Sequence, residues 1–196
     1  MLKKIYILAS THGITGAIRI VVNLAFWKVY NLALLRIMGT KVGKGTIFEG
    51  AVQVHGGNRV RIGNQVRLGA GVIVDAGVGG EVVIGSRTYV GRFATIISND
   101  KVEIGEKCLI SPFCYIIDSD HGFRDEAPIQ SQGYVISRVM IGDDVWIGVG
   151  SAILRGVTIG TGSVIGARSV VTRDIPRSVI AVGSPARVIK ERSPAS

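Results

Sequence analysis

The sequence predicts an all-β domain in which short extended segments stack as triangular coils. Three observations carry this prediction. Apolar residues recur six positions apart between Val42 and Val171, and a small or β-branched residue usually stands two positions before each of them. The chain also holds 27 glycines among 196 residues, about twice the usual share. A fixed short period of this kind is the signature of a stacked repeat.

A period of six excludes a helix, which repeats every 3.6 residues, and fits short strands joined by tight corners. Residues two apart on a strand point to the same side, so the apolar residue and the small residue before it should both point inward. Glycine often follows the apolar residue, where a corner needs a positive φ or a close approach of two backbones. The apolar positions form six triplets: Val42, Phe48, Val54; Ile62, Leu68, Val74; Ile84, Val90, Ile96; Ile104, Ile110, Ile116; Ile141, Ile147, Ile153; and Ile159, Ile165, Val171. The small inward positions are Thr46, Val52, Val66, Val72, Val78, Thr88, Ala94, Cys108, Cys114, Val145, Ser151, Val157, Ser163 and Ser169.

Interruptions of the period all follow the third segment of a triplet. The triplets begin at residues 42, 62, 84, 104, 141 and 159, which leaves 2, 4, 2, 19 and 0 residues beyond the eighteen of a full coil. All insertions should therefore lie at one corner of the prism, and insertions of this kind often carry function. The longest one, about 117–140, should form an arm that leaves after Ile116 and returns at Ile141.

The remaining segments are an N-terminal segment, 1–41, and a C-terminal tail, 177–196, on either side of the repeat domain, 42–176. Residues 1–41 contain six Lys or Arg and no Asp or Glu. The apolar run from Ile18 to Met38 lacks proline and ends at Gly39, which predicts a helix. Polar or charged residues interrupt it every four or five positions, so it suits a membrane interface better than a membrane span. The alternative is a helix that caps the open end of the repeat.

Three histidines offer imidazole chemistry: His12, His55 and His121. His121 begins the arm, where the chain leaves a rigid coil, and a neutral imidazole can take a proton from an alcohol near pH 7. The alternative is a histidine that only anchors the arm. Cys108 and Cys114 occupy small inward positions, so we expect buried thiols, neither a disulfide framework nor a metal site.

Two further stretches add a family resemblance. The chain returns from the arm as Ile141-Gly142-Asp143-Asp144-Val145-Trp146-Ile147-Gly148 and ends with Gly183-Ser184-Pro185-Ala186-Arg187-Val188-Ile189-Lys190. With the repeat and the histidine of the arm, these stretches resemble the hexapeptide-repeat O-acetyltransferases, such as the maltose and galactoside acetyltransferases and those of polysaccharide gene clusters. The resemblance implies a left-handed parallel β-helix of about six coils. It also implies an acetyl-CoA-dependent O-acyltransferase that transfers an acetyl group directly to a hydroxyl of a sugar or glycan precursor, without a metal.

In this resemblance His121 is the general base, and Trp146 lines the site. Asp118 and Asp120, like the other acidic residues of the arm, could orient the imidazole, and the sequence does not rank them. Ala167 and Thr172 correspond to family positions along the pantetheine arm of CoA. The residues expected to face the CoA phosphates are Arg173, Arg187 and Lys190. Taken without the resemblance, these basic residues read as solvated surface charges.

The chain departs from the family at positions that bear on the acceptor. Val149 stands where the family often has serine, and the stretch around Arg92 lacks the asparagine with which maltose-type enzymes hold the acceptor. The acceptor is therefore left open between a sugar and a lipid-linked sugar. The resemblance further implies a homotrimer with sites between neighbouring chains. We expect a cytoplasmic protein with no nucleic-acid partner. If residues 1–41 contact the membrane, the protein lies at its inner face. A non-catalytic scaffold, with His121 idle, is the alternative function.

Overall fold

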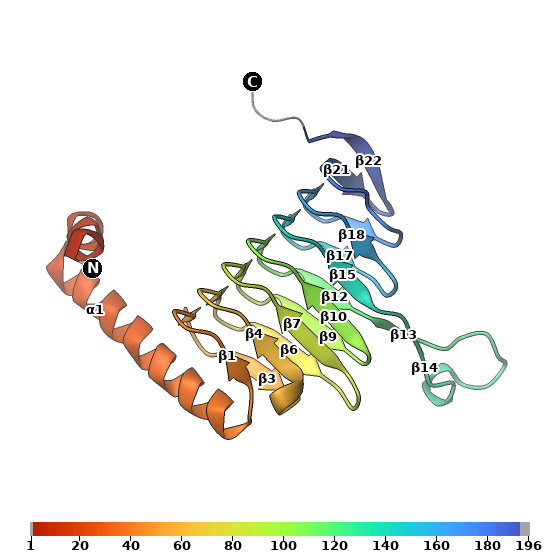
Figure 1. The fold of residues 1–196 in the computed structure, drawn as a ribbon, viewed down its shortest axis with the longest axis horizontal. Coiled ribbons are helices and arrows are strands. Elements are labelled where there is room, and N and C mark those ends of the chain that lie inside the picture. Colours follow the sequence, from red (N-terminus) through yellow and green to blue (C-terminus); the bar gives the residue numbers. More distant parts are fainter. Residues whose placement is uncertain (1, 193–196) are drawn as a thin grey trace.

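The computed structural model describes residues 2–192 of the chain, and describes side chains from residue 15 onward, with the exception of residue 17. The repeat forms a three-sided prism, and α1 (Leu2–Ile37) lies beside its first coil (Figure 1). The prism is a left-handed parallel β-helix, as the family resemblance implies. Two of its sheets have six strands each and the third has eight, which makes six complete coils and the beginning of a seventh.

We name the three faces sheets A, B and C in the order in which the chain visits them. Sheet A consists of β1 (Lys41–Val42), β4 (Val60–Ile62), β7 (Glu81–Ile84), β10 (Lys101–Ile104), β15 (Val139–Ile141) and β18 (Thr158–Ile159). Sheet B consists of β2 (Ile47–Phe48), β5 (Arg67–Leu68), β8 (Tyr89–Val90), β11 (Leu109–Ile110), β16 (Trp146–Ile147), β19 (Val164–Ile165), β21 (Val179–Gly183) and β22 (Ala186–Glu191). Sheet C consists of β3 (Gln53–His55), β6 (Ile73–Ala76), β9 (Thr95–Ser98), β12 (Tyr115–Ile117), β17 (Ala152–Ile153) and β20 (Val170–Val171). A short 3-10 helix, η1 (Gly57–Arg59), connects β3 to β4.

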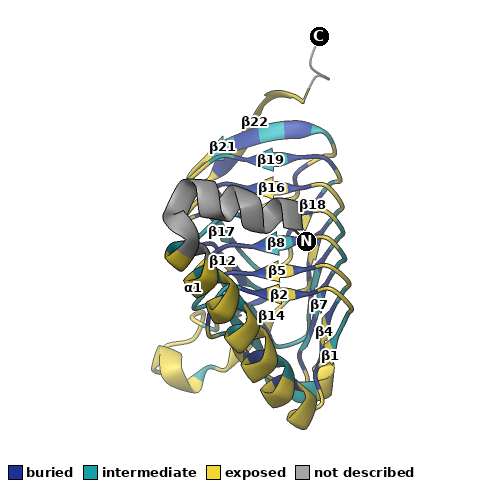
Figure 2. Ribbon diagram, turned by 90° about the vertical axis from the view of Figure 1, so that its left-hand side faces the viewer, coloured by how far each residue is buried: buried dark blue, intermediate teal, exposed yellow. Residues whose placement is uncertain are grey.

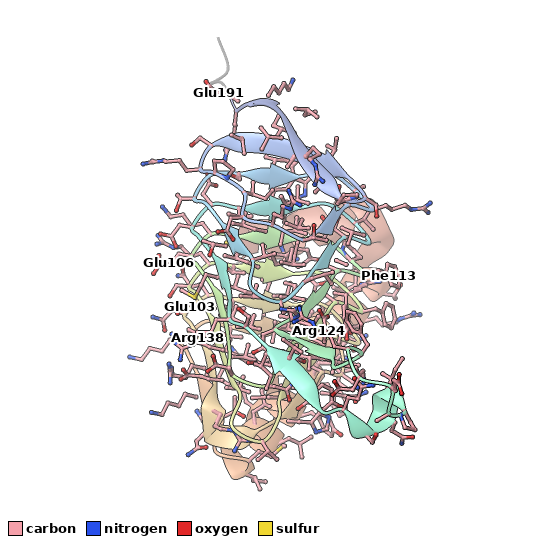
Figure 3. All side chains as sticks on the ribbon, turned by 90° about the vertical axis from the view of Figure 1, so that its right-hand side faces the viewer. Glu103, Glu106, Phe113, Arg124, Arg138 and Glu191 are labelled. Carbon is pink, nitrogen blue, oxygen red and sulfur yellow. The ribbon has the colours of Figure 1, made fainter. Side chains whose placement is uncertain are left out.

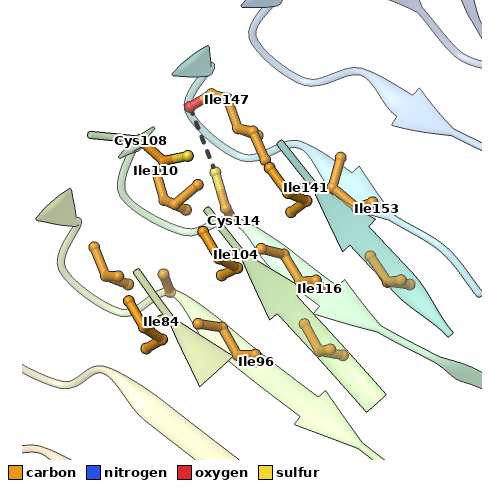
Figure 4. Close-up of a cluster of buried hydrophobic side chains, with 14 of the residues drawn as sticks. Ile84, Ile96, Ile104, Cys108, Ile110, Cys114, Ile116, Ile141, Ile147 and Ile153 are labelled. Carbon is orange, nitrogen blue, oxygen red and sulfur yellow. Dashed lines mark hydrogen bonds between the residues drawn. The ribbon is translucent and has the colours of Figure 1, made fainter. Parts of the chain in front are cut away.

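The core is a stack of identical layers. Every residue of the six triplets is buried except Val42, which is half-buried and packs against the core. Parallel pairing places each apolar residue directly over its counterpart in the next coil, as with Ile84, Ile104 and Ile141. Figure 4 shows how the isoleucines of neighbouring coils fill the interior around Cys108 and Cys114. Inward hydroxyl groups form hydrogen bonds within the prism. Thr88 Oγ1, for example, donates to the Gly105 carbonyl at 2.8 Å.

One predicted inward residue is wrong. Val78 is 98% exposed and lies in the turn between β6 and β7. The four-residue insertion at this corner shifts the frame, so Val82 takes the inward position two residues before Ile84. The other predicted small residues are buried, apart from Val52, which packs partly buried against the core.

The glycines that follow the apolar residues serve close approach, and the positive φ angles fall two residues later. A Cβ on Gly85 would lie 2.4 Å from the carbonyl carbon of Gly105 in the next coil, so no side chain fits there. The left-handed conformation occurs at Arg87, with φ of 63°, and at Lys107, with φ of 57°. Each such corner therefore combines two features. A glycine allows the backbone of the next coil to approach, and a residue two positions later adopts the left-handed conformation.

The N-terminal segment caps the first coil through the end of α1. Asn31 and Leu35 are buried, with 1% and 3% of their surface exposed. The Asn31 side chain donates to the Gly50 carbonyl at 3.0 Å and accepts from the Val52 N–H at 3.3 Å. These bonds satisfy backbone groups that the first coil, having no coil beneath it, would leave unpaired. At the other end of the prism, β21 and β22 form an antiparallel hairpin that extends sheet B.

Candidate functional site

The arm leaves the prism at the corner between sheets C and A, where all the insertions fall, as predicted. It begins with β13 (Ser119–His121), which pairs antiparallel with β14 (Tyr134–Ile136). A short 3-10 helix, η2 (Ile129–Ser131), lies between the two strands. Figure 3 views the molecule from the side on which the arm projects, with Arg124 of the arm and Arg138 of its return labelled.

His121 ends the outgoing strand and is exposed. It lies opposite Tyr134 in the register of the hairpin, with the two ring centroids 4.7 Å apart and the ring planes tilted by 36°. Among the described residues, no hydrogen bond joins its imidazole to a carboxylate. The imidazole is therefore positioned by the strand and by its contact with Tyr134, and the residue is exposed.

Asp118 is fully buried at the root of the arm. Its carboxylate accepts hydrogen bonds from Ser98 Oγ at 2.7 Å and from the backbone N–H groups of Asn99 and Asp100 at 2.8 and 2.9 Å. Its own carbonyl accepts from the Ser137 N–H at 2.8 Å, so the outgoing and returning chains meet at this residue. Asp118 thus fixes the point from which the arm departs, and its oxygens are occupied by the turn of the coil before.

Two ion pairs hold the root of the arm from either side. Arg155, from the following coil, donates to Asp120 at 2.6 Å. Arg138, on the returning chain, donates to Asp100 of the preceding coil at 2.7 Å, and this carboxylate raises the pKa of the guanidinium. The sequence analysis did not single out either arginine, because their partners lie 35 and 38 residues away along the chain.

The arm exposes large apolar side chains in its loop and on β14. The Gln132 side chain closes its loop by donating to the Asp125 and Ala127 carbonyls at 3.0 and 2.6 Å. The exposed fractions of these apolar side chains lie between 42% and 65%. Phe123 and Ile129 lie in the loop, and Tyr134, Val135 and Ile136 lie on β14, beside the strand that leaves the prism. An arm that is fixed by polar contacts at its root and exposes apolar side chains along its length suits contact with another surface.

Trp146 lies on the outer face of sheet B, away from the arm. Its indole N–H donates to Ser111 Oγ at 3.2 Å, and 47% of the residue is exposed. It borders a groove of about 360 Å³. The lining residues are Lys107, Leu109, Asp144, Val145, Trp146, Val164 and Arg192. Arg192 reaches across this groove to Asp144 at 2.9 Å.

The residues predicted to bind the acyl donor occupy three places. Thr172 and Arg173 follow β20 at the same corner as the root of the arm. Ala167 lies at the next corner, between β19 and β20. Arg187 and Lys190 lie on β22 at the end of sheet B and are exposed. Within one chain, only Thr172 and Arg173 of the predicted set lie at the corner from which the arm departs.

Neither cysteine offers reactive sulfur. Both thiols are free and buried, as predicted, and burial raises the pKa of Cys108 to about 11. Burial likewise raises the pKa of Cys114. Among the described residues, no group of three His, Cys, Asp or Glu side chains has an arrangement that could hold a metal ion.

The match to known proteins centres on the return from the arm. Residues 138–173 match the family model of the bacterial transferase hexapeptide, six repeats. The match covers 36 of the 196 residues and falls where the sequence already shows its six-residue period.

Curated relatives of this chain carry acetyltransferase names. A probable acetyltransferase of Mycobacterium tuberculosis, Rv3034c, is 46% identical over 107 residues, which are 54% of this chain and 36% of the relative. Galactoside O-acetyltransferase of Escherichia coli is 43% identical over 50% of this chain and 47% of its own length. The matched region therefore spans less than half of either relative. The putative colanic acid biosynthesis acetyltransferase WcaF of Escherichia coli is 28% identical over 85% of this chain and 75% of its own length.

Solved structures extend the similarity to more than four fifths of this chain. AntD, an N-acyltransferase from Bacillus cereus in complex with dTDP and coenzyme A, has a TM-score of 0.73 and 27% identity, over 82% of this chain and 89% of AntD. The Vibrio cholerae acetyltransferase VCA0836, in complex with acetyl coenzyme A, has a TM-score of 0.64 and 25% identity, over 85% of this chain and 79% of its own.

Proposed function

We propose that this protein is an O-acyltransferase that moves an acetyl group from acetyl-CoA to a hydroxyl of a sugar or glycan precursor. The observation that carries the proposal is an exposed His121 on an arm rooted in a hexapeptide-repeat prism. Acetyltransferase names among the relatives and a bound acyl-CoA in a structural neighbour support this chemistry. The scaffold alternative would give no reason for the polar network that fixes the root of the arm.

In the proposed mechanism the His121 imidazole accepts the proton of the acceptor hydroxyl. The oxygen attacks the thioester carbonyl, a backbone N–H stabilises the oxyanion, and the C–S bond breaks to release CoA, whose sulfur takes the proton from the imidazolium. A buried Asp118 and an ion-paired Asp120 are engaged elsewhere, so in this mechanism Tyr134 and the strand orient the ring.

The active unit in this proposal is a homotrimer. His121 and Trp146 lie on different sides of one prism, and the residues assigned to acyl-CoA are divided among two corners and sheet B. Contact of the exposed apolar side chains of the arm with a neighbouring prism would bring His121 beside the groove of that neighbour. Ala167, Thr172, Arg173, Arg187 and Lys190 are assigned to acyl-CoA in this arrangement. The protein would act in the cytoplasm, where acetyl-CoA is made, and this chemistry is independent of any contact that residues 1–41 make with a membrane.

A second candidate is transfer to an amine. AntD is an N-acyltransferase, and another of its structures contains a dTDP-linked amino sugar. An amine acceptor would need the same base and the same acyl donor, so the two candidates differ only in the acceptor. The name of the galactoside O-acetyltransferase favours the hydroxyl.

The test is CoA thiol release from acetyl-CoA with a panel of sugars, nucleotide-linked sugars, amino sugars and lipid-linked sugars. We expect a hydroxyl acceptor to release thiol, and His121→Ala to lower the rate by about 10²- to 10⁴-fold. His55→Ala is the matched control, because His55 is exposed on β3 of the prism and should leave the rate unchanged. Full activity in His121→Ala would contradict the mechanism. Failure of the protein to bind CoA at all would favour the scaffold.

A further inference from the structure

We propose that the side of α1 turned away from the prism docks on a membrane surface that contains anionic lipids. Four apolar residues form this side, and we call them the outward stripe: Ile18, Val22, Phe26 and Val29. Their exposed fractions are 58%, 61%, 58% and 70%. Spacings of four, four and three residues place them on one face of the helix. Figure 2 shows this exposed side of α1 facing the viewer.

The opposite side of the same helix holds the prism. Trp27, Asn31 and Leu35, spaced by four, face the first coil, and the last two are buried. By length and composition, Ile18–Ile37 is apolar enough to cross a membrane, a test that signal sequences and buried helices also pass, and 11% of its apolar window is buried. Because one side of α1 packs against the prism, lipid cannot surround the helix as it surrounds a membrane-spanning helix. In this proposal the outward stripe therefore lies on the membrane surface.

Charge points to lipids of negative sign. The first acidic residue of the chain is Glu49, and the residues before it include seven Lys or Arg. Arg19, Lys28 and Arg36 are exposed on the described part of α1. Each cation held near an anionic lipid surface strengthens binding about fivefold. Exposed apolar side chains beside cations without counter-charges supply the two attractions that bind a helix to an anionic membrane surface, apolar burial and charge.

A second copy of the chain fits the outward stripe less well. It would bring the same cations against themselves, because no acidic residue lies on this helix to pair with them. The arm projects from the other side of the prism in Figure 1, so a docked helix leaves it free. Docking and acyl transfer should therefore be separable in experiment.

The test is co-sedimentation of the full-length protein with vesicles of phosphatidylcholine alone or mixed with phosphatidylglycerol. We expect binding to the mixed vesicles, weakening as salt rises because screening acts on exposed charges. Val29→Asp should weaken this binding by at least about tenfold, since it removes an apolar contact with the lipid and adds a negative charge that anionic lipids repel. Val78→Asp is the matched control, as Val78 is 98% exposed on the prism, and it should bind like the unchanged protein. Helix content by circular dichroism checks that both variants fold.

Equal binding by Val29→Asp and Val78→Asp would overturn the proposal, and so would a failure of the unchanged protein to bind either kind of vesicle. Equal binding to both kinds of vesicle would overturn the role of charge. Efficient cross-linking of Val22→Cys between copies, without vesicle binding, would assign the stripe to the oligomer instead. Thiol release with a soluble acceptor should be the same in both variants, so a failed docking test leaves the proposed enzyme activity standing.

Discussion

The prism and the arm are stabilised by different physics. In the prism, Ile110 and Ile147 stack in register, fully buried, and any apolar residue of similar shape would meet the same need. In the arm, position depends on single polar contacts, of which the buried Asp118 carboxylate is the clearest. Each coil of the prism packs on a neighbouring coil of similar sequence, so the same kind of contact repeats. The arm occurs once, so its contacts do not repeat.

This difference between the prism and the arm predicts that stability and activity respond to substitutions in different regions. Prism changes should cost folding free energy while leaving the site intact, because the layers do not touch His121. Changes at the root of the arm should cost activity beyond their effect on stability, because they move the residue that we propose as the base. Four predictions test this division, beginning with the largest effect.

Ile110→Ala should lower the free energy of unfolding by about 2–5 kcal/mol, because it opens a cavity in a fully buried layer. Urea denaturation measures this loss. Ile37→Ala is the matched control, since Ile37 is 82% exposed and the change should cost less than about 0.5 kcal/mol. Below its unfolding transition, Ile110→Ala should keep thiol-release activity within about twofold. A large loss of activity in the folded variant would show that the layers position the arm after all.

Cys108 makes the stability of the prism depend on pH in the alkaline range. Burial raises its pKa from 9.0 to about 11 in the folded chain. The unfolded thiol ionises first, so the stability is complete below pH 9 and falls as the pH rises toward 11, by roughly 2–3 kcal/mol. Urea denaturation across this range should show a steeper fall for the unchanged protein than for Cys108→Ala. The comparison cancels the other groups that titrate there, and equal slopes would contradict the assigned pKa.

Much of the prism could be predicted from the sequence, because each contact repeats at a fixed spacing. The period identified the inward residues, the corner that takes all insertions and the start of the arm. It failed at Val78, where a four-residue insertion shifted the frame within a single turn. The final hairpin, β21 and β22, was also missed, because it follows the end of the period.

The root of the arm could not be predicted in the same way. The sequence offered Asp118 and Asp120 as residues that could orient His121, without ranking them. In the structure, the Asp118 carboxylate accepts hydrogen bonds from the turn that begins at Ser98, and Asp120 is ion-paired with Arg155. These partners come from neighbouring coils and lie 20 and 35 residues away, and no periodic pattern marks them. That Asp118 or Asp120 acts directly on the imidazole stays a prediction.

Asp118→Asn should expose the dependence of the arm on its root. The amide puts an N–H₂ where a carboxylate oxygen accepts, so at least one donor loses its partner, at a cost of about 1–3 kcal/mol. We expect kcat for thiol release to fall about tenfold through displacement of His121, with KM for acetyl-CoA little changed. Asp143→Asn is the matched control. Asp143 accepts from the Glu106 N–H at a corner of the prism, and its loss should lower stability without lowering kcat. Equal kcat values in the two variants would mean that the arm does not depend on Asp118.

The smallest effect should come from the ion pair of Arg155 with Asp120. Both partners are partly exposed, 32% and 39%, so a double-mutant cycle with Arg155→Gln and Asp120→Asn should give a coupling free energy of about 0.2–1 kcal/mol for stability. The prism offers a comparable pair in Arg61 and Glu81, exposed 45% and 30%. The two cycles should agree in stability, because solvent screens both pairs to a similar degree. They should differ in thiol-release rate, where only the pair at the arm root should show coupling, and added salt should remove it. Coupling in both pairs would mean that the prism transmits small strains to His121, and the division between the two regions would fail.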